Sequence, residues 1–327
     1  METGNEHMKC KNEWIQVLKM LACLLITNSH CMYPATLLKI GGASSVFQAG
    51  GGWGVTLFFA VSGYLSAGSG APFGAWLRKR YLRILPVSVI MVIVYYFVSS
   101  SQMPFPHFLC VAYWFVTAIV IYYPVFYLLD HIKHGYLAGI AAYCILYAIL
   151  YICIYDGGFF VEKEGTSFFK SFQYFIVMLM GGLYKKQKAR LKLRSIPVEL
   201  GLILLGIGIW ALEYALMTFF KTGYALQFLI TVSRCAVVIP ILSLVDDLQE
   251  KKPLTLKKNG FIDRIADSTL EIYLVQIAFL PLINKLEVPY SILVFWVTAI
   301  VGGCLVHQVY TGLIDNIFQS TGDKAAK

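Results

Sequence analysis

The stretch that decides the class of protein is LKMLACLLITNSHCMYP, residues Leu18 to Pro34. It is apolar enough to cross a membrane, yet it carries four polar residues, Lys19, Asn28, Ser29 and His30. Ionisable residues are unfavourable inside a bilayer and usually face a bundle interior or a watery cavity. The stretch therefore predicts a membrane helix with a functional polar side.

The rest of the 327-residue chain has the same character. Hydrophobic residues make up 58% of it, charged residues only 14%, and the mean hydropathy is +0.68. This composition predicts an all-α, polytopic membrane bundle. A helix needs about 20 mostly apolar residues to cross a bilayer, and about ten segments qualify: 14–34, 48–67, 82–99, 109–129, 136–155, 167–184, 197–217, 223–245, 264–283 and 290–312. The gaps between them are short, so we expect one transmembrane domain over residues 1–327.

The basic residues predict the orientation. With the N-terminus in the cytoplasm, 20 Lys and Arg fall on the inner side and five on the outer side, while Lys19 and Arg234 lie within spans. Short basic loops resist translocation, so both termini are expected in the cytoplasm. The net charge of +9 is then mostly a basic cytoplasmic face, whose default partner is anionic membrane lipid. Basic residues do not alternate with aromatic ones on a soluble face, which argues against nucleic acid.

Two other features bear on structure. The eight cysteines lie mostly inside apolar segments without paired metal-ligand spacing, so we expect neither a disulfide framework nor a zinc site. The glycine-rich stretch 41–54 reads GGASSVFQAGGGWG. So many glycines weaken a continuous helix. We expect an outer loop or re-entrant segment there, with a flexible connector as the alternative.

Lys19 and His30 are the first candidates for chemistry. They are eleven residues apart, close to three helical turns, which puts them on one face about 16 Å apart along the axis. Cys23 and Thr27 fall on the same stripe. Histidine accepts protons near neutral pH, which suits general-base or nucleophilic work. The plainer alternatives are that Lys19 extends to the headgroups and that His30 is structural.

Three further stretches join this helix. WGVTLFFAVSGYL occupies residues 53–65, WLRKRYLRILP occupies 76–86, and STLEIYLVQ occupies 268–276. Together with the first stretch they resemble the signature blocks of the acyltransferase 3 family of membrane acyltransferases. Lys19 stands where that family usually has arginine, Thr56 where an aspartate is common, and Gln276 where a histidine is common. Lysine lacks the planar fork of arginine, and Gln276 cannot titrate, so His30 is the better-placed base.

The resemblance implies an activity. We expect transfer of an acyl group, acetyl above all, from cytoplasmic acyl-CoA to a hydroxyl of an envelope carbohydrate or glycolipid. Acyl-CoA would be a co-substrate, with no cofactor or metal bound permanently, and the location would be a bacterial plasma membrane. His30 would act as base or acyl carrier, and Lys19 would stabilise charge along the path.

Binding roles follow from the same resemblance. Arg80 and Arg83 are three residues apart on one helical face, where they could meet the phosphates of coenzyme A; the plainer alternative is a positive-inside anchor. Six candidate substrate-binding residues lie in the matching stretches, namely Asn28, Ser62, Tyr64, Glu271, Tyr273 and Gln276, and Trp114, outside them, is an aromatic residue that could line a sugar site.

Two interpretations from other classes remain open. A secondary transporter or glycan flippase would also have many spans with buried charges, and a non-catalytic scaffold would explain the missing family aspartate and histidine. Other polar residues within spans add little: Arg234 and Glu271 could form a buried pair, and His307 is more often a satisfied bundle residue than a catalyst.

Overall fold

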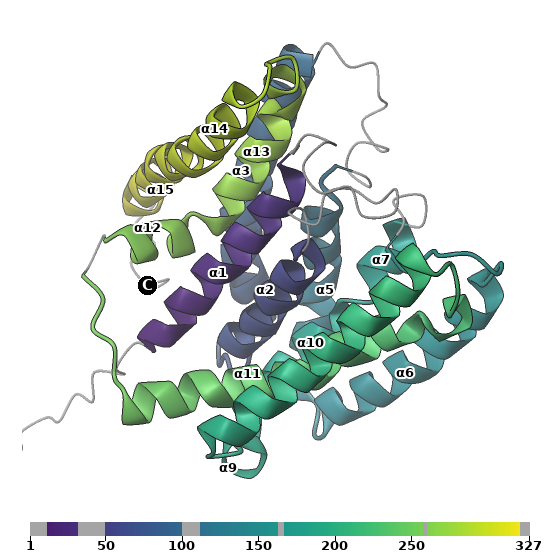
Figure 1. The fold of residues 1–327 in the computed structure, drawn as a ribbon. Coiled ribbons are helices and arrows are strands. Elements are labelled where there is room, and N and C mark those ends of the chain that lie inside the picture. The colour runs from purple at the N-terminus through teal and green to yellow at the C-terminus, as the bar shows by residue number, and fades with distance from the viewer. Residues whose placement is uncertain (1–11, 32–49, 100–111, 163–166, 258–259, 321–327) are drawn as a thin grey trace, which may run out of the picture.

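The computed structural model describes residues 12–31, 50–99, 112–162, 167–257 and 260–320, and all regular structure in these residues is helical (Figure 1). This confirms the predicted all-α class. The elements in chain order are α1 (Glu13–His30), α2 (Gly51–Ser66), α3 (Phe73–Ser99), α5 (Trp114–His131), α6 (Gly135–Ile154), α7 (Ser167–Phe172), α8 (Phe175–Lys186), α9 (Lys188–Leu191), α10 (Ile196–Phe219), η3 (Tyr224–Leu226), α11 (Phe228–Lys251), α12 (Phe261–Asp267), α13 (Thr269–Ile283), α14 (Tyr290–Val297), η4 (Thr298–Gly302) and α15 (Gly303–Ser320).

Six helices among the described residues are long and apolar enough to cross a membrane. They are Phe73–Ser99, Trp114–His131, Gly135–Ile154, Ile196–Phe219, Tyr224–Lys251 and Tyr290–Leu313. The pair α12 and α13 makes a seventh if its 71° bend lies within one span. A polytopic membrane protein is therefore confirmed, whereas the predicted count of about ten stays a prediction.

The other predicted spans fall outside these six. α1, which covers most of 14–34, has 18 residues and is not among them, and two more correspond to shorter helices. α2 has 16 residues and α8 has 12, which gives lengths of about 24 and 18 Å, below the roughly 30 Å of a bilayer core. The predicted span 167–184 is divided between α7 and α8. Hydropathy alone does not reveal such breaks, because the apolar run continues across them.

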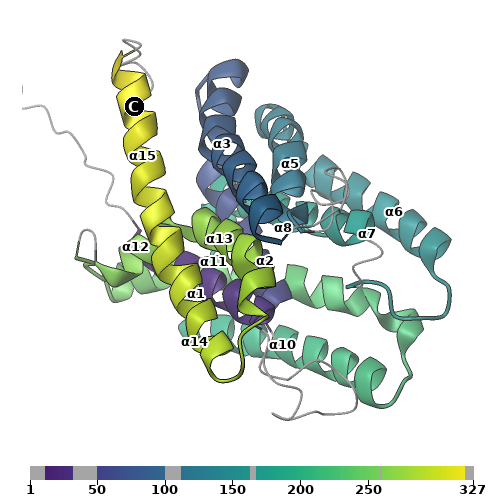
Figure 2. The same cartoon turned by 90° about the horizontal axis from the view of Figure 1, so that it is seen from above.

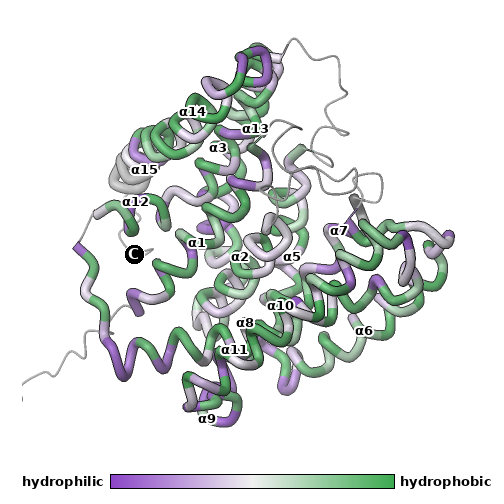
Figure 3. Tube along the Cα trace, viewed as in Figure 1, coloured by the Kyte–Doolittle hydropathy of each residue, from purple (hydrophilic) through white to green (hydrophobic). Residues whose placement is uncertain are grey.

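Lipid-facing and protein-facing helices differ clearly in burial. In the most apolar part of α6 only 6% of the residues are buried inside the protein, whereas in the most apolar part of Tyr224–Lys251, which contains α11, 56% are buried. Ile145 and Ile152 of α6 are 65% and 76% exposed, and Figure 3 shows the apolar colouring along this helix. So large an apolar surface is unfavourable in water, as expected for a helix that faces lipid.

Glycines bring α2 close to two neighbours. A Cβ at Gly54 would meet the backbone of Ala22 in α1, and a Cβ at Gly63 would collide with the Met178 carbonyl of α8. The loop predicted over 41–54 is therefore wrong at its end, because residues 51–54 form the first turn of α2. Residues 41–49 lie outside the described part. Close helix packing outweighs the low helix propensity of these glycines.

α13 holds the central position for the site. It packs against α1, α3 and α15, and Figures 1 and 2 show it beside these helices. α12 ends at Asp267 and α13 begins at Thr269, with a bend of 71° between them. The bend brings the polar end of α12 against α1, so one segment of chain presents polar residues to two neighbouring helices.

Candidate active site

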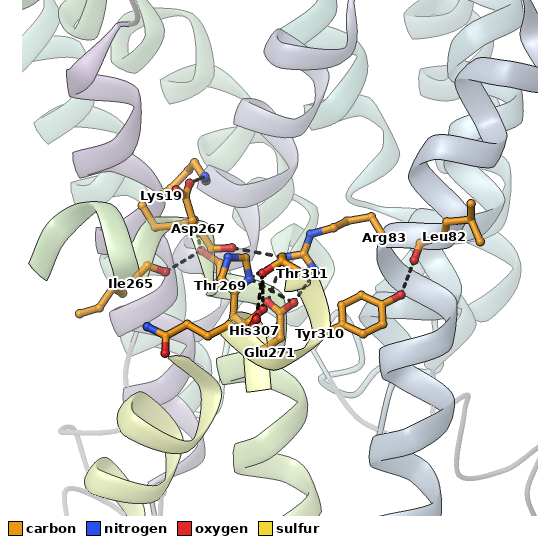
Figure 4. Close-up of polar contacts among 12 residues, drawn as sticks. Lys19, Leu82, Arg83, Ile265, Asp267, Thr269, Glu271, His307, Tyr310 and Thr311 are labelled. Atoms are coloured by element: carbon orange, nitrogen blue, oxygen red, sulfur yellow. Dashed lines mark hydrogen bonds and ion pairs between the residues drawn. The ribbon is translucent and has the colours of Figure 1, made fainter. Parts of the chain in front are cut away.

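A buried carboxylate is the centre of the first polar group. Glu271 of α13 is fully buried and accepts two hydrogen bonds from the guanidinium of Arg83 in α3, one of them 3.0 Å from Nη2 to Oε2 (Figure 4). His307 of α15 completes the group: its Nδ1 lies 3.1 Å from Arg83 Nη2 and 3.3 Å from Glu271 Oε1. The imidazole can accept from the arginine or, when protonated, donate to the carboxylate.

Lys19 belongs to the same polar region. Its Nζ lies 3.1 Å from Asp267 Oδ1 and donates to Gln16 Oε1 at 3.0 Å. The carbonyl of Asp267 in turn accepts from Arg83 Nη2 at 3.3 Å. We call Lys19, Arg83, Asp267, Glu271 and His307 the charge cluster. It joins α1, α3, α12, α13 and α15 through two sets of ionic contacts, which are linked by the hydrogen bond from Arg83 to the Asp267 backbone carbonyl.

The sequence suggested a different partner for Glu271. The possible pair of Arg234 with Glu271 is wrong, because Glu271 binds Arg83 and Arg234 of α11 binds Glu162. His307 was set aside as a satisfied bundle residue, and Asp267 was not singled out. In the sequence, an ionisable residue within an apolar helix is the pattern that indicates a member of such a cluster. That signal cannot identify the partner, because the partners lie far apart in sequence.

His30 forms a second polar group at the C-terminal end of α1. The side chain is half-buried, and its Nδ1 lies 2.9 Å from the Ile26 carbonyl and 3.2 Å from Gln276 Nε2. A carbonyl only accepts, so the first contact requires that Nδ1 carry the proton and leaves the Nε2 lone pair of His30 free for chemistry. The ring of Tyr273 lies 6.1 Å from the imidazole.

Gln276 is oriented by this imidazole. Its side chain is fully buried, and its Oε1 has no hydrogen-bond partner in the described structure. Turning the amide over would let Oε1 accept from the same Nδ1–H of His30, and amide orientation is assigned from such networks. In that arrangement two oxygens hold the tautomer whose Nε2 is unprotonated. Gln276 then supports His30 without titrating.

One seam links the two groups. Lys19 contacts Asp267 and His30 contacts Gln276, so both side chains lie on the side of α1 that faces α12 and α13. Cys23 lies between them on α1 and packs with Ile272 of α13. The helical rise puts Glu271 and Gln276 about 7.5 Å apart along α13. The charge cluster and His30 therefore lie toward opposite ends of the contact between α1 and α13.

Arg80 and Arg83 make different contacts. The guanidinium of Arg80 lies 3.6 Å from the ring centroid of Trp76 and 5.4 Å from that of Tyr123 in α5. Arg83 instead points to Glu271 of α13. The structure therefore does not bring the two guanidinium groups to one set of partners, and their joint role as a coenzyme site stays a prediction.

The remaining candidates divide between the two ends of the bundle. Trp114 lies near the His30 end, because its neighbour Phe115 is 5.5 Å from the ring of Tyr273. Half-buried Asn28 stands two residues before His30. Tyr64 lies at the opposite end of α2, where its hydroxyl donates to Asp246 at 3.4 Å. Ser62, also half-buried, belongs to that half of α2.

These features define a class of protein: a multi-pass membrane bundle with a charge cluster shared by five helices and a histidine whose Nδ1 contacts the Ile26 carbonyl and Gln276. The chain belongs to the acyltransferase 3 family, since the family model, described as an acyltransferase domain, matches residues 12–307. The matched region begins just before α1 and ends at His307 of the charge cluster. The resemblance inferred from the sequence is thus confirmed. No curated protein and no solved structure matches the chain.

Proposed function

We propose that this membrane acyltransferase moves an acetyl group from cytoplasmic acyl-CoA to a hydroxyl of an envelope carbohydrate or glycolipid. Family membership supports acyl transfer in a membrane, and the donor, the acyl group and the acceptor are our proposal. We also propose that both termini are cytoplasmic in a bacterial plasma membrane. The end of the bundle that carries Lys19 then faces the acyl-CoA supply.

The observation that carries the proposal is the seam between α1 and α13. It has cationic groups at one end and an unprotonated imidazole nitrogen at the other, about 16 Å away along α1. The layout of an acyl-CoA complements this seam. Its anionic phosphates and its thioester are separated by an extended pantetheine arm, so the phosphates can meet the cationic end while the thioester lies near the imidazole. Arg83 retains 34% side-chain exposure and Lys19 20%, so both can meet a phosphate while their carboxylate partners hold them in place.

The chemical step then follows from His30. Its Nε2 takes the proton of the acceptor hydroxyl while the oxygen forms a bond to the thioester carbonyl carbon. The carbon–sulfur bond of the tetrahedral intermediate breaks, and the leaving thiolate takes the proton from the imidazolium. His30 ends neutral, with an acetyl ester and free coenzyme A as products. A route through an acetyl-histidine would use the same nitrogen.

The test is a reconstitution. Purified protein in lipid nanodiscs receives labelled acetyl-CoA and a panel of glycans, and free thiol and labelled ester are measured together. We expect equal amounts of both with an accepted glycan. Thiol release without any labelled glycan would contradict the proposed acceptor class. The Arg80→Ala/Arg83→Ala variant should weaken coenzyme binding in a salt-dependent way, and unchanged affinity would remove both residues from the donor site.

One observation favours transport as a second candidate. The helix pair α12–α13 is bent by 71° beside buried charges, and discontinuous helices carry the substrate sites of many transporters. Uptake of a labelled glycan into proteoliposomes without acyl-CoA would favour this function. Ester formation that depends on His30 favours acyl transfer.

A further inference from the structure

A pocket at the start of α6 lies outside both the charge cluster and the group around His30. It has a volume of about 230 Å³ and lies between the turn that joins α5 to α6 and the last turn of α8. This is several times the volume that one water molecule needs. One wall is polar and the other is apolar, and the residues that matter here are Lys133, His134 and Lys186 on the first and Ile132, Leu137 and Leu183 on the second.

The length of α6 places this pocket at the level of the lipid headgroups. α6 has 20 residues, which span about 30 Å, the thickness of a bilayer core. The pocket lies at Gly135, the first residue of this helix. Ile132 and Leu137 in its apolar wall are 57% and 47% exposed. The apolar wall therefore continues into the lipid-facing surface of α6.

The C-terminal end of α2 shows on which side of the bundle the pocket lies. The backbone N–H of Gly68, just after α2, donates to Asp130 of α5 at 3.0 Å, beside the pocket. At the same end of α2, the Tyr64 hydroxyl donates to Asp246. Asp246 also accepts from Asn12, the residue before α1, at 3.1 Å. The pocket therefore lies at the end where α1 begins, which the split of basic residues predicts to be cytoplasmic.

Two lysines make the polar wall cationic. Lys186 Nζ lies 2.8 Å from Asp130 Oδ1 and also donates to the Asp130 carbonyl. An ammonium has three N–H groups, so one remains for a ligand while Asp130 holds the side chain in place. Lys133 is exposed and forms no ion pair with another described residue. Asp130 is the one acidic residue of α5, α6 and α8, so the polar wall keeps one net positive charge.

We propose that this pocket binds the phosphate of an anionic phospholipid, with Lys133 and Lys186 as the cationic partners and the apolar wall against the first part of the acyl chains. A soluble phosphate would occupy the polar wall alone, whereas a lipid covers both walls. A zwitterionic lipid carries a cation of its own, which the lysines repel. The inference goes beyond the proposed function, because lipid binding requires neither acyl-CoA nor His30.

Competition between two lipids tests the inference. The full chain, delipidated in detergent, is mixed with phosphatidylglycerol and phosphatidylcholine of identical acyl chains, and native mass spectrometry counts the bound lipid. We expect an about fivefold or greater preference for phosphatidylglycerol that falls with salt. Equal binding would overturn the inference. Glycerol 1-phosphate has the phosphate without acyl chains and should not displace the lipid at equal concentration. Displacement would assign the pocket to soluble phosphates instead.

Matched variants assign the preference to this pocket. Lys133→Gln should reduce it about fivefold, the effect of one lysine near an anionic headgroup. Lys252→Gln removes an exposed lysine just after α11, outside the pocket, and should keep it. The charge-neutral double variant Asp130→Asn/Lys186→Gln should also reduce the preference, and Lys133→Gln alone decides if that variant fails to fold. An equal loss in the Lys133 and Lys252 variants would contradict a specific site.

Discussion

Glu271, fully buried on α13, is joined by two hydrogen bonds to the guanidinium of Arg83 on α3, and the two residues are 188 positions apart in the chain. Breaking a buried ion pair leaves an uncompensated charge. The side chain of Arg83 is 34% exposed, so water can solvate its guanidinium and reduce the cost of losing the carboxylate partner. The pair therefore serves both stability and the orientation of Arg83.

Glu271→Gln is expected to lower the unfolding free energy by about 3 kcal/mol. This is the lower end of the range typical of a broken buried ion pair. The double variant Arg83→Gln/Glu271→Gln should lose less than the sum of its single variants, because neither partner then remains charged and unpaired. Thermal unfolding in detergent measures both. Glu287→Gln, at an exposed carboxylate, is the control. If the losses of unfolding free energy in the two single variants add up to the loss in the double variant, the contact between the two side chains does not contribute to stability.

His30→Ala is expected to reduce acyl transfer by about a hundredfold or more, because general-base catalysis contributes at least that much. Coenzyme binding, followed by ligand-induced thermal stabilisation, should stay close to that of the unaltered protein. His131→Ala removes an exposed histidine and serves as the matched control. Transfer at an unchanged rate in the His30 variant would make the seam structural or part of a transport path.

Gln276→Leu is expected to lower kcat about tenfold, in the range of lost support for a functional histidine. Leucine cannot accept from His30 Nδ1–H, so the imidazole loses one of its two orienting contacts. Gln276→His, which restores the residue common in the family, should recover activity and alter the pH–rate profile. A leucine variant with the original kcat and pH profile would mean that Gln276 only fills space.

Lys19→Arg is expected to retain activity, because arginine keeps the charge and can still reach Asp267, now with a planar fork. Lys19→Met keeps much of the apolar stem but loses the ion pair, which is 3.1 Å long. It should reduce transfer more than it reduces stability, since Asp267 is 45% exposed and is readily solvated. The kcat and the melting temperature of each variant are compared. Equal activity in both variants would contradict a role for the charge.

Both termini are expected in the cytoplasm, from the split of 20 to five basic residues. A cysteine introduced near Lys324 should resist an impermeant thiol reagent on intact cells, and cysteines introduced between residues 41 and 49 should react. The same sites in permeabilised cells provide the control. Labelling of the C-terminus from outside would require an odd number of spans.

Some properties of this protein could be inferred from the sequence alone because they depend on local patterns. Apolar runs near the length of a bilayer crossing predict membrane helices wherever they occur. The spacing of Lys19 and His30 predicts a shared face, because helix geometry repeats every 3.6 residues. The motifs around Gly54, Arg83 and Tyr273 indicated the family.

Other properties depend on contacts between distant segments. The helical first turn of α2 forms although its glycines predict a loop, since they let backbone approach backbone in a packed bundle. Glu271 could have bound either Arg83 or Arg234, and His307 could have been inert, because charge and hydropathy do not encode which helices become neighbours. The sequence by itself determined a helical membrane acyltransferase with a polar first helix. Only the tertiary structure decided the charge cluster, the partner of His30 and the pairing of Arg234 with Glu162, because ionic contacts and hydrogen bonds act over a few ångströms between residues that folding alone brings together.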